Sequence, residues 1–260
     1  VGGGTDLYVQ IYDQLIDQDV GLIADSPELR FTKVENDVCT LGAGNTATDL
    51  LESYEIQAMF PQLREHIKLV ASSPIRNIAT LGGNIVNASP IGDFTAFFLA
   101  LNAKIILTEN SHNRTIHLKD FYKGYKDLNK SEEEIISAIS FEVPKGNSHF
   151  NFEKVSKRIH LDIASVNTAI QISVSDNKVT GVHLSAGGVG PIPMYLNETC
   201  AFLQGKELLP QNIKSANEVL QSEISPISDV RGSAGYKRLL LRQLFYAHFI
   251  KLFPNNFTLE

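Results

Sequence analysis

Two glycine-rich stretches hold the residues of this sequence that are best suited to bind a phosphorylated ligand. The first runs from Val1 to Leu7 (VGGGTDL), and the second runs from Ala79 to Asp93 (ATLGGNIVNASPIGD). Glycine has no Cβ, so backbone N–H groups can approach an anion closely, and successive N–H groups form a concave site for phosphate oxygens. Two such stretches suit a ligand with two phosphates, such as a dinucleotide. Each stretch alone is equally compatible with an ordinary tight turn.

The other residue types give no sign of a catalytic cluster made of side chains. The sequence has no HExxH motif and no Ser-His-Asp arrangement, and its histidines are scattered. Its two cysteines, Cys39 and Cys200, are too few for an iron–sulfur cluster or a cysteine-rich zinc site. We expect both to be buried thiols of a cytoplasmic protein.

The length and composition restrict the classes of protein to which the chain can belong. With 260 residues, of which 43% are hydrophobic, it can form one large domain or two smaller ones. The formal net charge is −6 and no long basic run occurs, which argues against nucleic acid as a partner. The most apolar stretch, residues 94–107, is interrupted by Asn102 and Lys104, so no membrane span is predicted.

The first part of the chain mixes short strand and helix patterns. Strand patterns occur at residues 29–34, 37–42, 104–107, 115–118 and 134–143. Helix patterns occur at residues 46–54, 61–70 and 93–101. The first two strands predict a hairpin with a turn at Glu35 and Asn36, and Thr46 or Thr48 can cap the first helix.

A loop signal at residues 144–147 (PKGN) marks the predicted domain boundary. Strand patterns follow at residues 150–155, 164–174 and 179–186, and helix patterns follow at residues 196–203, 211–221 and 234–253. Strands that come before helices are typical of an α+β fold.

The two glycine-rich stretches, taken together and in this order, resemble those of the flavin-binding subunit or domain of the molybdenum hydroxylases. This group contains xanthine dehydrogenase, aldehyde oxidase and carbon monoxide dehydrogenase. GGGTDL at residues 2–7 resembles the family's first FAD loop, and TLGGN at residues 80–84 with ASPIGD at residues 88–93 resembles the second. The resemblance extends to about Phe253.

The resemblance implies a fold for each part of the chain. Residues 1–146 would form an FAD-binding domain of the PCMH and vanillyl-alcohol oxidase type. Residues 147–260 would form a smaller domain like the C-terminal domain of the carbon monoxide dehydrogenase flavoprotein, with helices packed on a three-stranded antiparallel sheet. In the family a strand precedes the first FAD loop, so we expect this sequence to lack the start of the FAD-binding domain.

The resemblance also implies which residues hold FAD. The pyrophosphate or an adjoining ribose would be bound by residues of both loops: Gly2, Gly3, Gly4, Thr5, Asp6, Leu7, Thr80, Gly82, Gly83 and Asn84. Asp93 would accept hydrogen bonds from ribityl or ribose hydroxyls, and it would equally serve as the N-cap of the helix that follows.

Three further residues are implied at the flavin ring. Val70 aligns with a position that can be aromatic in the family, and an aliphatic side chain there removes a stacking contact. Ile136 would pack against the isoalloxazine, or simply belong to the core. Lys154 would place a cation near the N1–C2 edge of the flavin, or be a solvated strand lysine.

The implied function is electron transfer. FAD, held non-covalently in a cleft between the two domains, would accept electrons from 2Fe-2S clusters that a molybdopterin centre has reduced. The molybdenum and iron–sulfur sites would lie on partner subunits or domains, and NAD would receive the electrons, as in a bacterial xanthine dehydrogenase. An alternative is a stand-alone FAD-dependent oxidase or reductase of the wider PCMH family, and another is a nucleotide-binding interaction protein. No catalytic side chain and no metal ligand is predicted in this chain.

Overall fold

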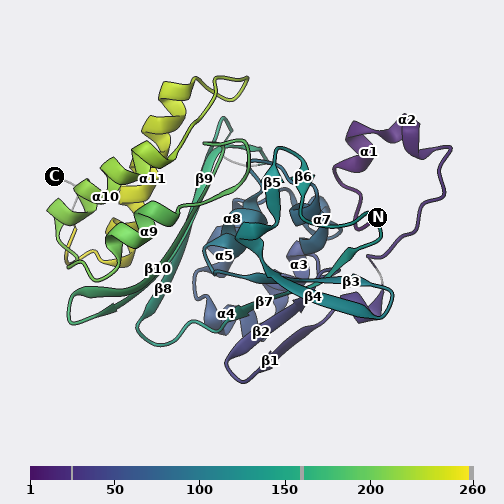
Figure 1. The fold of residues 1–260 in the computed structure, drawn as a ribbon, viewed down its shortest axis with the longest axis horizontal. Coiled ribbons are helices and arrows are strands. Elements are labelled where there is room, and N and C mark those ends of the chain that lie inside the picture. Colours follow the sequence, from purple (N-terminus) through teal and green to yellow (C-terminus); the bar gives the residue numbers. More distant parts are fainter. Residues whose placement is uncertain (25, 159–160, 258–260) are drawn as a thin grey trace. The chain divides into compact units, whose positions relative to one another are not determined.

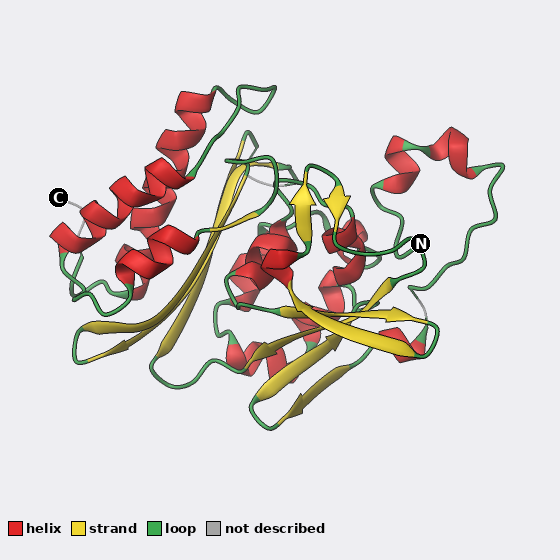
Figure 2. Ribbon diagram, in the orientation of Figure 1, coloured by secondary structure: helices red, strands yellow, loops and turns green. Residues whose placement is uncertain are grey.

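The computed structural model describes residues 1–24, 26–158 and 161–257. The chain forms two compact units, which are drawn in Figure 1 and coloured by secondary structure in Figure 2. The first unit contains residues 1–89 and 103–143, and the second contains residues 90–102 and 144–260. The segment 90–102 therefore folds with the C-terminal part of the chain, from which residues 103–143 separate it in sequence.

The first unit is built on an antiparallel sheet with the strand order β1-β2-β7-β3-β4. The strands are β1 (Thr32–Glu35), β2 (Val38–Gly42), β3 (Lys104–Glu109), β4 (His112–His117) and β7 (Ile135–Glu142). The strand patterns of this part of the sequence are thereby confirmed. The β1–β2 hairpin turns at Asn36 and Asp37, slightly later than predicted, because these residues hold the left-handed φ angles of 50° and 62° that a type I′ turn requires.

Short helices make up most of the remainder of the first unit. They are α1 (Leu7–Gln10), α2 (Tyr12–Leu15), α3 (Ala47–Glu52), α4 (Tyr54–Met59), α5 (Leu63–Lys68), α6 (Ser73–Arg76) and α7 (Leu81–Val86). Two 3₁₀ turns (Pro27–Leu29 and Leu118–Asp120) and the strand pair β5 (Tyr122–Gly124) and β6 (Asp127–Leu128) complete it. Apolar side chains of both the helices and the sheet are buried, and they include Leu41, Leu50, Ile67, Leu81, Ile85, Ile105 and Ile139.

The helix predicted at residues 46–54 corresponds to α3, and a separate helix that was not predicted, α4, begins at Tyr54. Ser53 has an extended backbone (φ −63°, ψ 123°), and its hydroxyl accepts a hydrogen bond from the N–H of Ile56, so it ends one helix and caps the next. Thr46, rather than Thr48, caps α3. Its hydroxyl accepts from the N–H of Asp49 while the Asp49 carboxylate accepts from the N–H of Thr46, which is a capping box.

The second unit is built on a sheet with the order β11-β10-β9-β8. Its strands are β8 (Ser148–Ser156), β9 (Ala164–Ser175), β10 (Lys178–Gly187) and the short β11 (Met194–Tyr195), all paired antiparallel. The three long strands confirm the sequence prediction, and β11 is an addition to it. Asp176 and Asn177, with φ angles of 49° and 60°, form the β9–β10 turn.

Helices cover both faces of this sheet. α8 (Asp93–Leu99) lies on one face, and α9 (Asn197–Leu203), α10 (Pro210–Glu223) and α11 (Ala234–Leu252) lie on the other (Figure 1). Successive residues of a strand point to opposite faces, so Thr168 and Ile170 of β9 face α11, whereas Asn167 faces the α8 segment. The α+β class and the packing of helices on the second sheet are confirmed.

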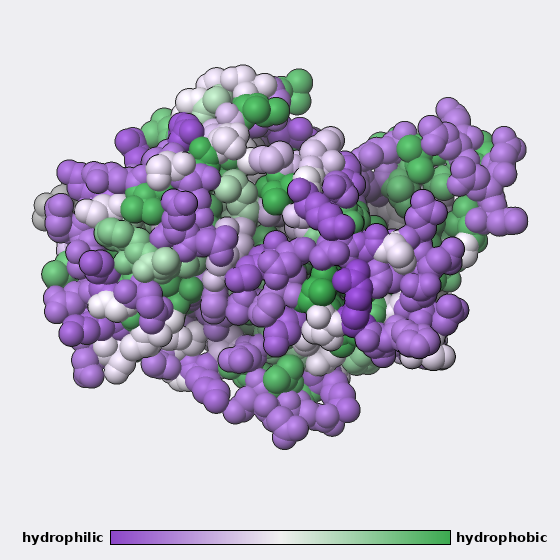
Figure 3. Space-filling view, in the orientation of Figure 1, coloured by the Kyte–Doolittle hydropathy of each residue, from purple (hydrophilic) through white to green (hydrophobic). Residues whose placement is uncertain are grey.

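Some large apolar side chains of the N-terminal segment are exposed. The exposed fractions of Val9, Ile16 and Leu22 are 82%, 63% and 68%. On the face drawn in Figure 3, hydrophilic side chains predominate and apolar ones form smaller separate areas.

Within the described ranges, no helix has both the length and the apolar composition that crossing a membrane requires.

Candidate functional site

The first glycine-rich stretch is a loop that leads into α1 and lies against the second stretch. A Cβ added to Gly3 would stand 1.6 Å from the carbonyl oxygen of Ile78, and one added to Gly2 would stand 2.4 Å from Oγ1 of Thr80. The Ile78 carbonyl is a backbone group that cannot yield to such a contact, so glycine is needed at residue 3 for the close approach of two chain segments. The fold thus brings together the two stretches that the sequence singled out.

The backbone of this loop presents hydrogen-bond donors without acceptors. Within the described structure, the N–H groups of residues 2–6 donate to no protein acceptor. The carbonyl groups are used instead, since Gly4 O accepts from the N–H of Tyr8 and Asp6 O accepts from the N–H of Gln10. Gly4 has a left-handed φ of 66°. Consecutive free N–H groups around such a residue form a nest for an anion.

The second stretch differs from the expected loop, because Leu81 to Val86 form the helix α7. Thr80 is its N-cap, and Thr80 Oγ1 accepts a hydrogen bond from the N–H of Gly83 at 3.1 Å. The N–H of Gly82 donates to Ala43 O at 2.9 Å. The N–H groups of these two glycines are therefore already bonded inside the protein, unlike those of the first stretch.

The glycines of α7 are also required by packing. A Cβ on Gly82 would lie 2.8 Å from the Cβ of Ala43, and one on Gly83 would lie 2.7 Å from Thr80 Oγ1. Asn84 follows in the first turn of α7, where its N–H donates to Thr80 O. In this stretch, glycine therefore permits a helix to start against the segment of the same chain that contains Ala43.

Val70 and Ile136, the aliphatic residues implied at the flavin ring, are both buried in the first unit. Val70 follows α5 with 8% of its surface exposed, and Ile136 lies on β7 with 4% exposed. Ile136 pairs with Leu107 of the neighbouring strand β3.

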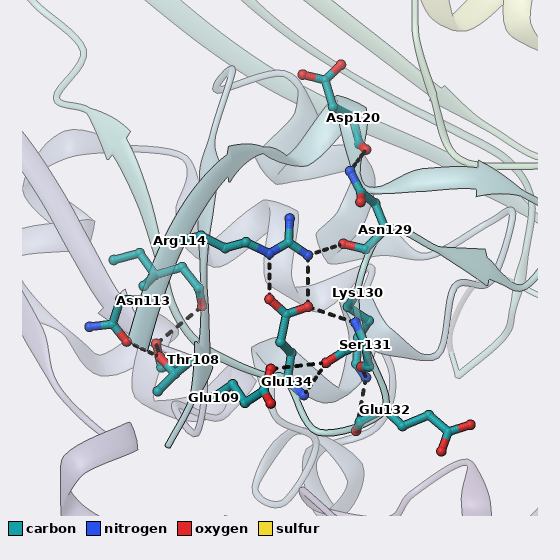
Figure 4. A network of polar contacts seen from close by, with 12 residues as sticks. Thr108, Glu109, Asn113, Arg114, Asp120, Asn129, Lys130, Ser131, Glu132 and Glu134 are labelled. Carbon is teal, nitrogen blue, oxygen red and sulfur yellow. Dashed lines mark hydrogen bonds and ion pairs between the residues drawn. The ribbon is translucent and has the colours of Figure 1, made fainter. Parts of the chain in front are cut away.

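An ion pair holds the start of the strand that carries Ile136 (Figure 4). Arg114 of β4 donates two hydrogen bonds to the Glu134 carboxylate, at 2.5 Å and 2.8 Å. The N–H of Ser131 donates a third at 2.8 Å. The Arg114 hydrogen bonds, assisted by that N–H, lower the pKa of Glu134 to about 2. Sequence reasoning missed this pair, because its members belong to separate strand patterns.

In the second unit, Asp93 and Lys154 form a buried ion pair. Lys154 Nζ lies 2.6 Å from Asp93 Oδ2, and the two side chains are 3% and 13% exposed. The alternative of a solvated lysine is therefore wrong. The alternative of Asp93 as an N-cap is also wrong, because Gly92 occupies that position and Asp93 is the first residue of α8.

The surroundings of the pair determine its charge. Burial raises the pKa of Asp93, and the Lys154 ammonium and the amide of Asn167 partly offset this effect. Each carboxylate oxygen accepts one hydrogen bond from nitrogen, Oδ2 from Lys154 and Oδ1 from Asn167 at 2.7 Å. Two donors on separate oxygens match an ionised carboxylate. Lys154 is thus one half of a neutral pair and acts on its surroundings as a dipole.

Asn167 is a polar residue of this cluster that sequence reasoning missed. It is fully buried on β9, and its amide nitrogen donates to Asp93 and to the carbonyl oxygen of Ile91 at 3.1 Å. A signal was present, because an asparagine interrupts the small and apolar residues of a predicted strand. A buried amide in such a place needs hydrogen-bond partners.

The two cysteines lie in the interior of the protein. Cys39 and Cys200 are buried, as predicted, and they are not joined in a disulfide. Burial raises the pKa of Cys39 to about 12, so this thiol stays protonated. In the described ranges, no group of three or more His, Cys, Asp or Glu side chains is arranged to hold a metal ion.

Two protein families match this chain, one for each part. Residues 1–145 match the family described as "FAD binding domain in molybdopterin dehydrogenase". Residues 151–252 match the "CO dehydrogenase flavoprotein C-terminal domain". These matches cover both glycine-rich stretches and the second sheet with its helices.

Individual relatives agree with the family matches. The chain is 30% identical to the glyceraldehyde dehydrogenase medium chain of Sulfolobus acidocaldarius, over 84% of this chain and 76% of that protein. It is 27% identical to the nicotinate dehydrogenase FAD-subunit of Eubacterium barkeri, over 97% and 87%. It is 29% identical to the xanthine dehydrogenase of Emericella nidulans, over 95% of this chain but 19% of that longer protein.

Solved structures share the fold along nearly the whole chain. A carbon monoxide dehydrogenase structure from Hydrogenophaga pseudoflava superposes with a TM-score of 0.87 and 26% identity, covering 94% of this chain and 85% of that one. The quinoline 2-oxidoreductase of Pseudomonas putida 86, at 21% identity, shares the fold with a TM-score of 0.84. The resemblance found in the sequence is confirmed, and the chain belongs to the FAD-binding family of the molybdopterin dehydrogenases, a family of oxidoreductase components.

Proposed function

We propose that this chain binds FAD and carries electrons within a molybdenum hydroxylase complex. Its partners would be a molybdenum-cofactor subunit and an iron–sulfur subunit or domain, with 2Fe-2S clusters delivering electrons to FAD and NAD receiving them. The relatives named above, a dehydrogenase medium chain and a dehydrogenase FAD-subunit, support the role of one component among several. The NAD acceptor follows the resemblance to xanthine dehydrogenases.

One observation carries the cofactor assignment, and it is the run of free N–H groups at residues 2–6. A pyrophosphate carries charged oxygens that need several donors, and consecutive backbone N–H groups around a left-handed glycine supply them. The residues present therefore fit the diphosphate of FAD. We assign Gly2, Gly3, Gly4, Thr5 and Asp6 to this contact, with Leu7 beside them.

The second stretch has a supporting part in this proposal. Gly82 and Gly83 lie in the first turn of α7, and Thr80, its N-cap, lies against Gly2 of the first loop. Asn84 is the side chain of this stretch that we assign to direct contact with the cofactor. Val70 and Ile136 are assigned to the flavin ring as apolar contacts.

The second unit contributes Asp93 and Lys154 to the proposed site. FAD supplies the redox chemistry when bound, and this chain's own residues bind and orient it. The Asp93 carboxylate would accept hydrogen bonds from cofactor hydroxyls, and the Lys154 ammonium would donate to the flavin. We propose the FAD-binding domain as residues 1–146 and the smaller domain as residues 147–260.

Reconstitution with FAD tests the proposal directly. The purified chain is incubated with FAD and desalted, and its absorbance is recorded before and after acid denaturation. We expect flavin absorbance with the protein and complete release into the supernatant on denaturation, because neither glycine-rich stretch contains a His or Cys for a covalent link. Absence of bound flavin from the chain, alone and copurified with its partner subunits, would contradict FAD binding.

A second measurement tests the acceptor. NADH is added to the FAD-loaded chain under anaerobic conditions, and bleaching of the flavin absorbance is followed by rapid mixing. Bleaching by NADH supports NAD as the acceptor. If NADH causes no bleaching, and oxygen but not NAD reoxidises a sample whose flavin was first reduced with dithionite, the result would favour the stand-alone oxidase alternative.

A further inference from the structure

We propose that Asn167 is a positioning residue of the FAD site, which fixes the Asp93 carboxylate and, through it, the Lys154 ammonium. The inference rests on the proposed function, because the contact of this pair with FAD belongs to that proposal. Asn167 itself is assigned no contact with the cofactor. Its part is to hold the two charged side chains in one arrangement.

The sheet places Asn167 in line with the residues on which it acts. On β9, it pairs directly with Lys154 of β8 on one side and with Gly187 of β10 on the other. Directly paired residues of an antiparallel sheet point to the same face. Asn167 and Lys154 therefore share the face that α8 covers, and Asp93 is the first residue of that helix.

The orientation of the Asn167 amide is determined by its two acceptors. Nδ2 donates to Asp93 Oδ1 at 2.7 Å and to the carbonyl oxygen of Ile91 at 3.1 Å. A reversed amide would direct its own oxygen at both of these oxygens. Asn167 thus joins the backbone that precedes α8 to the carboxylate at its first residue.

The carboxylate cannot turn without losing a partner. Oδ2 of Asp93 accepts from Lys154 Nζ, and Oδ1 accepts from Asn167. Rotation about the Cβ–Cγ bond would break one bond or both. The Lys154 side chain is 3% exposed, so little water can replace a lost partner. The hydrogen bond that Asn167 donates therefore holds the carboxylate whose other oxygen accepts from the Lys154 ammonium.

Gly187 keeps the space that this arrangement needs. A Cβ at residue 187 would lie 2.2 Å from Asn167 Oδ1 and 3.0 Å from the carbonyl oxygen of Pro90. Oδ1 of Asn167 is buried and has no hydrogen-bond partner in the described structure. An unbonded buried oxygen is unfavourable, and it is tolerated here while the amide nitrogen faces Asp93. The neighbouring Gly188, with φ 83°, donates its N–H to Pro90 O at 2.9 Å and fixes the same turn.

The test is a double-mutant cycle between Asn167 and Lys154, measured on the FAD-loaded full chain. The variants are Asn167→Ala, Lys154→Met and the double variant, with Asn167→Ser as a milder change whose hydroxyl is too short to reach Asp93. Two readouts are taken, the dissociation constant for FAD and the flavin reduction potential. Urea unfolding of each variant records the effect on stability separately.

We expect Asn167→Ala to weaken FAD binding about tenfold, as for the loss of one hydrogen bond to a charged group. The reduction potential should move in the same direction as in Lys154→Met. In the Lys154→Met background, Asn167→Ala should change the dissociation constant for FAD by less than about twofold and should leave the reduction potential unchanged, because the ammonium that Asn167 positions is gone. Asn217→Ala is the matched control, since Asn217 is also a buried asparagine of the second unit with an unbonded Oδ1.

The outcomes separate this inference from the proposed function. Additive effects of Asn167→Ala and Lys154→Met, or a wild-type potential in both Asn167 variants, would overturn the positioning role while FAD binding stands. If Asn217→Ala changed FAD affinity and reduction potential as much as Asn167→Ala, the effect would be one of general destabilisation, and the positioning role would again be overturned. A wild-type chain that binds no FAD would overturn the proposed function, and this inference with it.

Discussion

In the described structure, the N–H groups of residues 2–6 in the first glycine-rich stretch have no protein acceptor, whereas the second stretch uses N–H groups to begin α7. Both contain adjacent glycines, and they lie against each other at Gly2, Gly3 and Thr80, which belong to the first unit. The glycines of the first permit an open nest, and those of the second permit close packing. Substitutions in the first should therefore affect FAD binding most, and substitutions in the second should affect stability most.

The largest expected effect comes from Gly3→Val in the first stretch. A side chain there would meet Ile78 O at 1.6 Å and displace the loop, so the nest would lose its shape. Loss of two hydrogen bonds to phosphate, each worth about 1.5–3 kcal/mol, should weaken FAD binding by about 100-fold or more. Fluorescence titration with FAD measures it. Gly146→Val is the control, because no atom lies within 4 Å of a Cβ at residue 146. An equal loss of FAD affinity in that variant would contradict the assignment of the nest to the first stretch.

Gly82→Ala in the second stretch should act mainly on stability. Its Cβ would lie 2.8 Å from the Cβ of Ala43 in a buried position. Overpacking of this kind costs about 1–3 kcal/mol in the free energy of unfolding, which urea denaturation measures. Gly235→Ala in α11, where nothing lies within 4 Å, should cause no loss. A Gly82→Ala variant with unchanged stability and much weaker FAD binding would reverse the roles of the two stretches.

The different structural roles of the two glycine-rich stretches could not be predicted from the sequence, although most of the strands could. Strands such as β3 and β9 follow from alternating residues that lie next to one another in the chain. The start of α7 at Thr80 depends on Ala43 and Asn45, whose carbonyl groups accept from Gly82 and Leu81. A contact between segments so far apart in sequence leaves no local pattern.

The same limit applies to the charged residues of the second unit. Their places in the motifs marked Lys154 and Asp93 as candidates. Their pairing, however, joins α8 to β8, and residues 103–143 of the first unit separate these two elements in sequence. Burial of a lysine depends on such a partner, because a strand lysine without one remains in water. Sequence alone therefore gave the candidates for the site, and the tertiary structure gave the neutral pair and the part of Asn167.

A smaller effect is expected when the cap of α7 is removed. Thr80→Val deletes the hydroxyl that accepts from the N–H of Gly83, which should cost about 1 kcal/mol in the free energy of unfolding. Thr80→Ser keeps the hydroxyl and should restore most of that loss. The affinity for FAD should fall much less than in Gly3→Val. A Thr80→Val variant that unfolds at the same urea concentration as the wild type would show that the cap contributes nothing.

The smallest effect at neutral pH is expected from Glu134, which holds the strand on which α7 packs. Its pKa is about 2 in the folded chain against an ordinary value of 4.5. Because the folded value is the lower one, the stabilisation is present above about pH 4.5 and is lost as the pH falls toward 2. Arg114 is 41% exposed, so water screens the pair, and Glu134→Gln should cost about 0.5 kcal/mol at pH 7.

The pH dependence makes this last effect measurable. Urea unfolding of the wild type at several values between pH 5 and pH 2 should show a steeper fall in stability than the same series for Glu134→Gln, because the variant has no carboxylate to protonate. Glu132→Gln is the matched control, since Glu132 lies in the same loop and points away from Arg114 (Figure 4). Parallel curves for wild type and Glu134→Gln would mean that the start of β7, and with it the support of α7, does not depend on this ion pair.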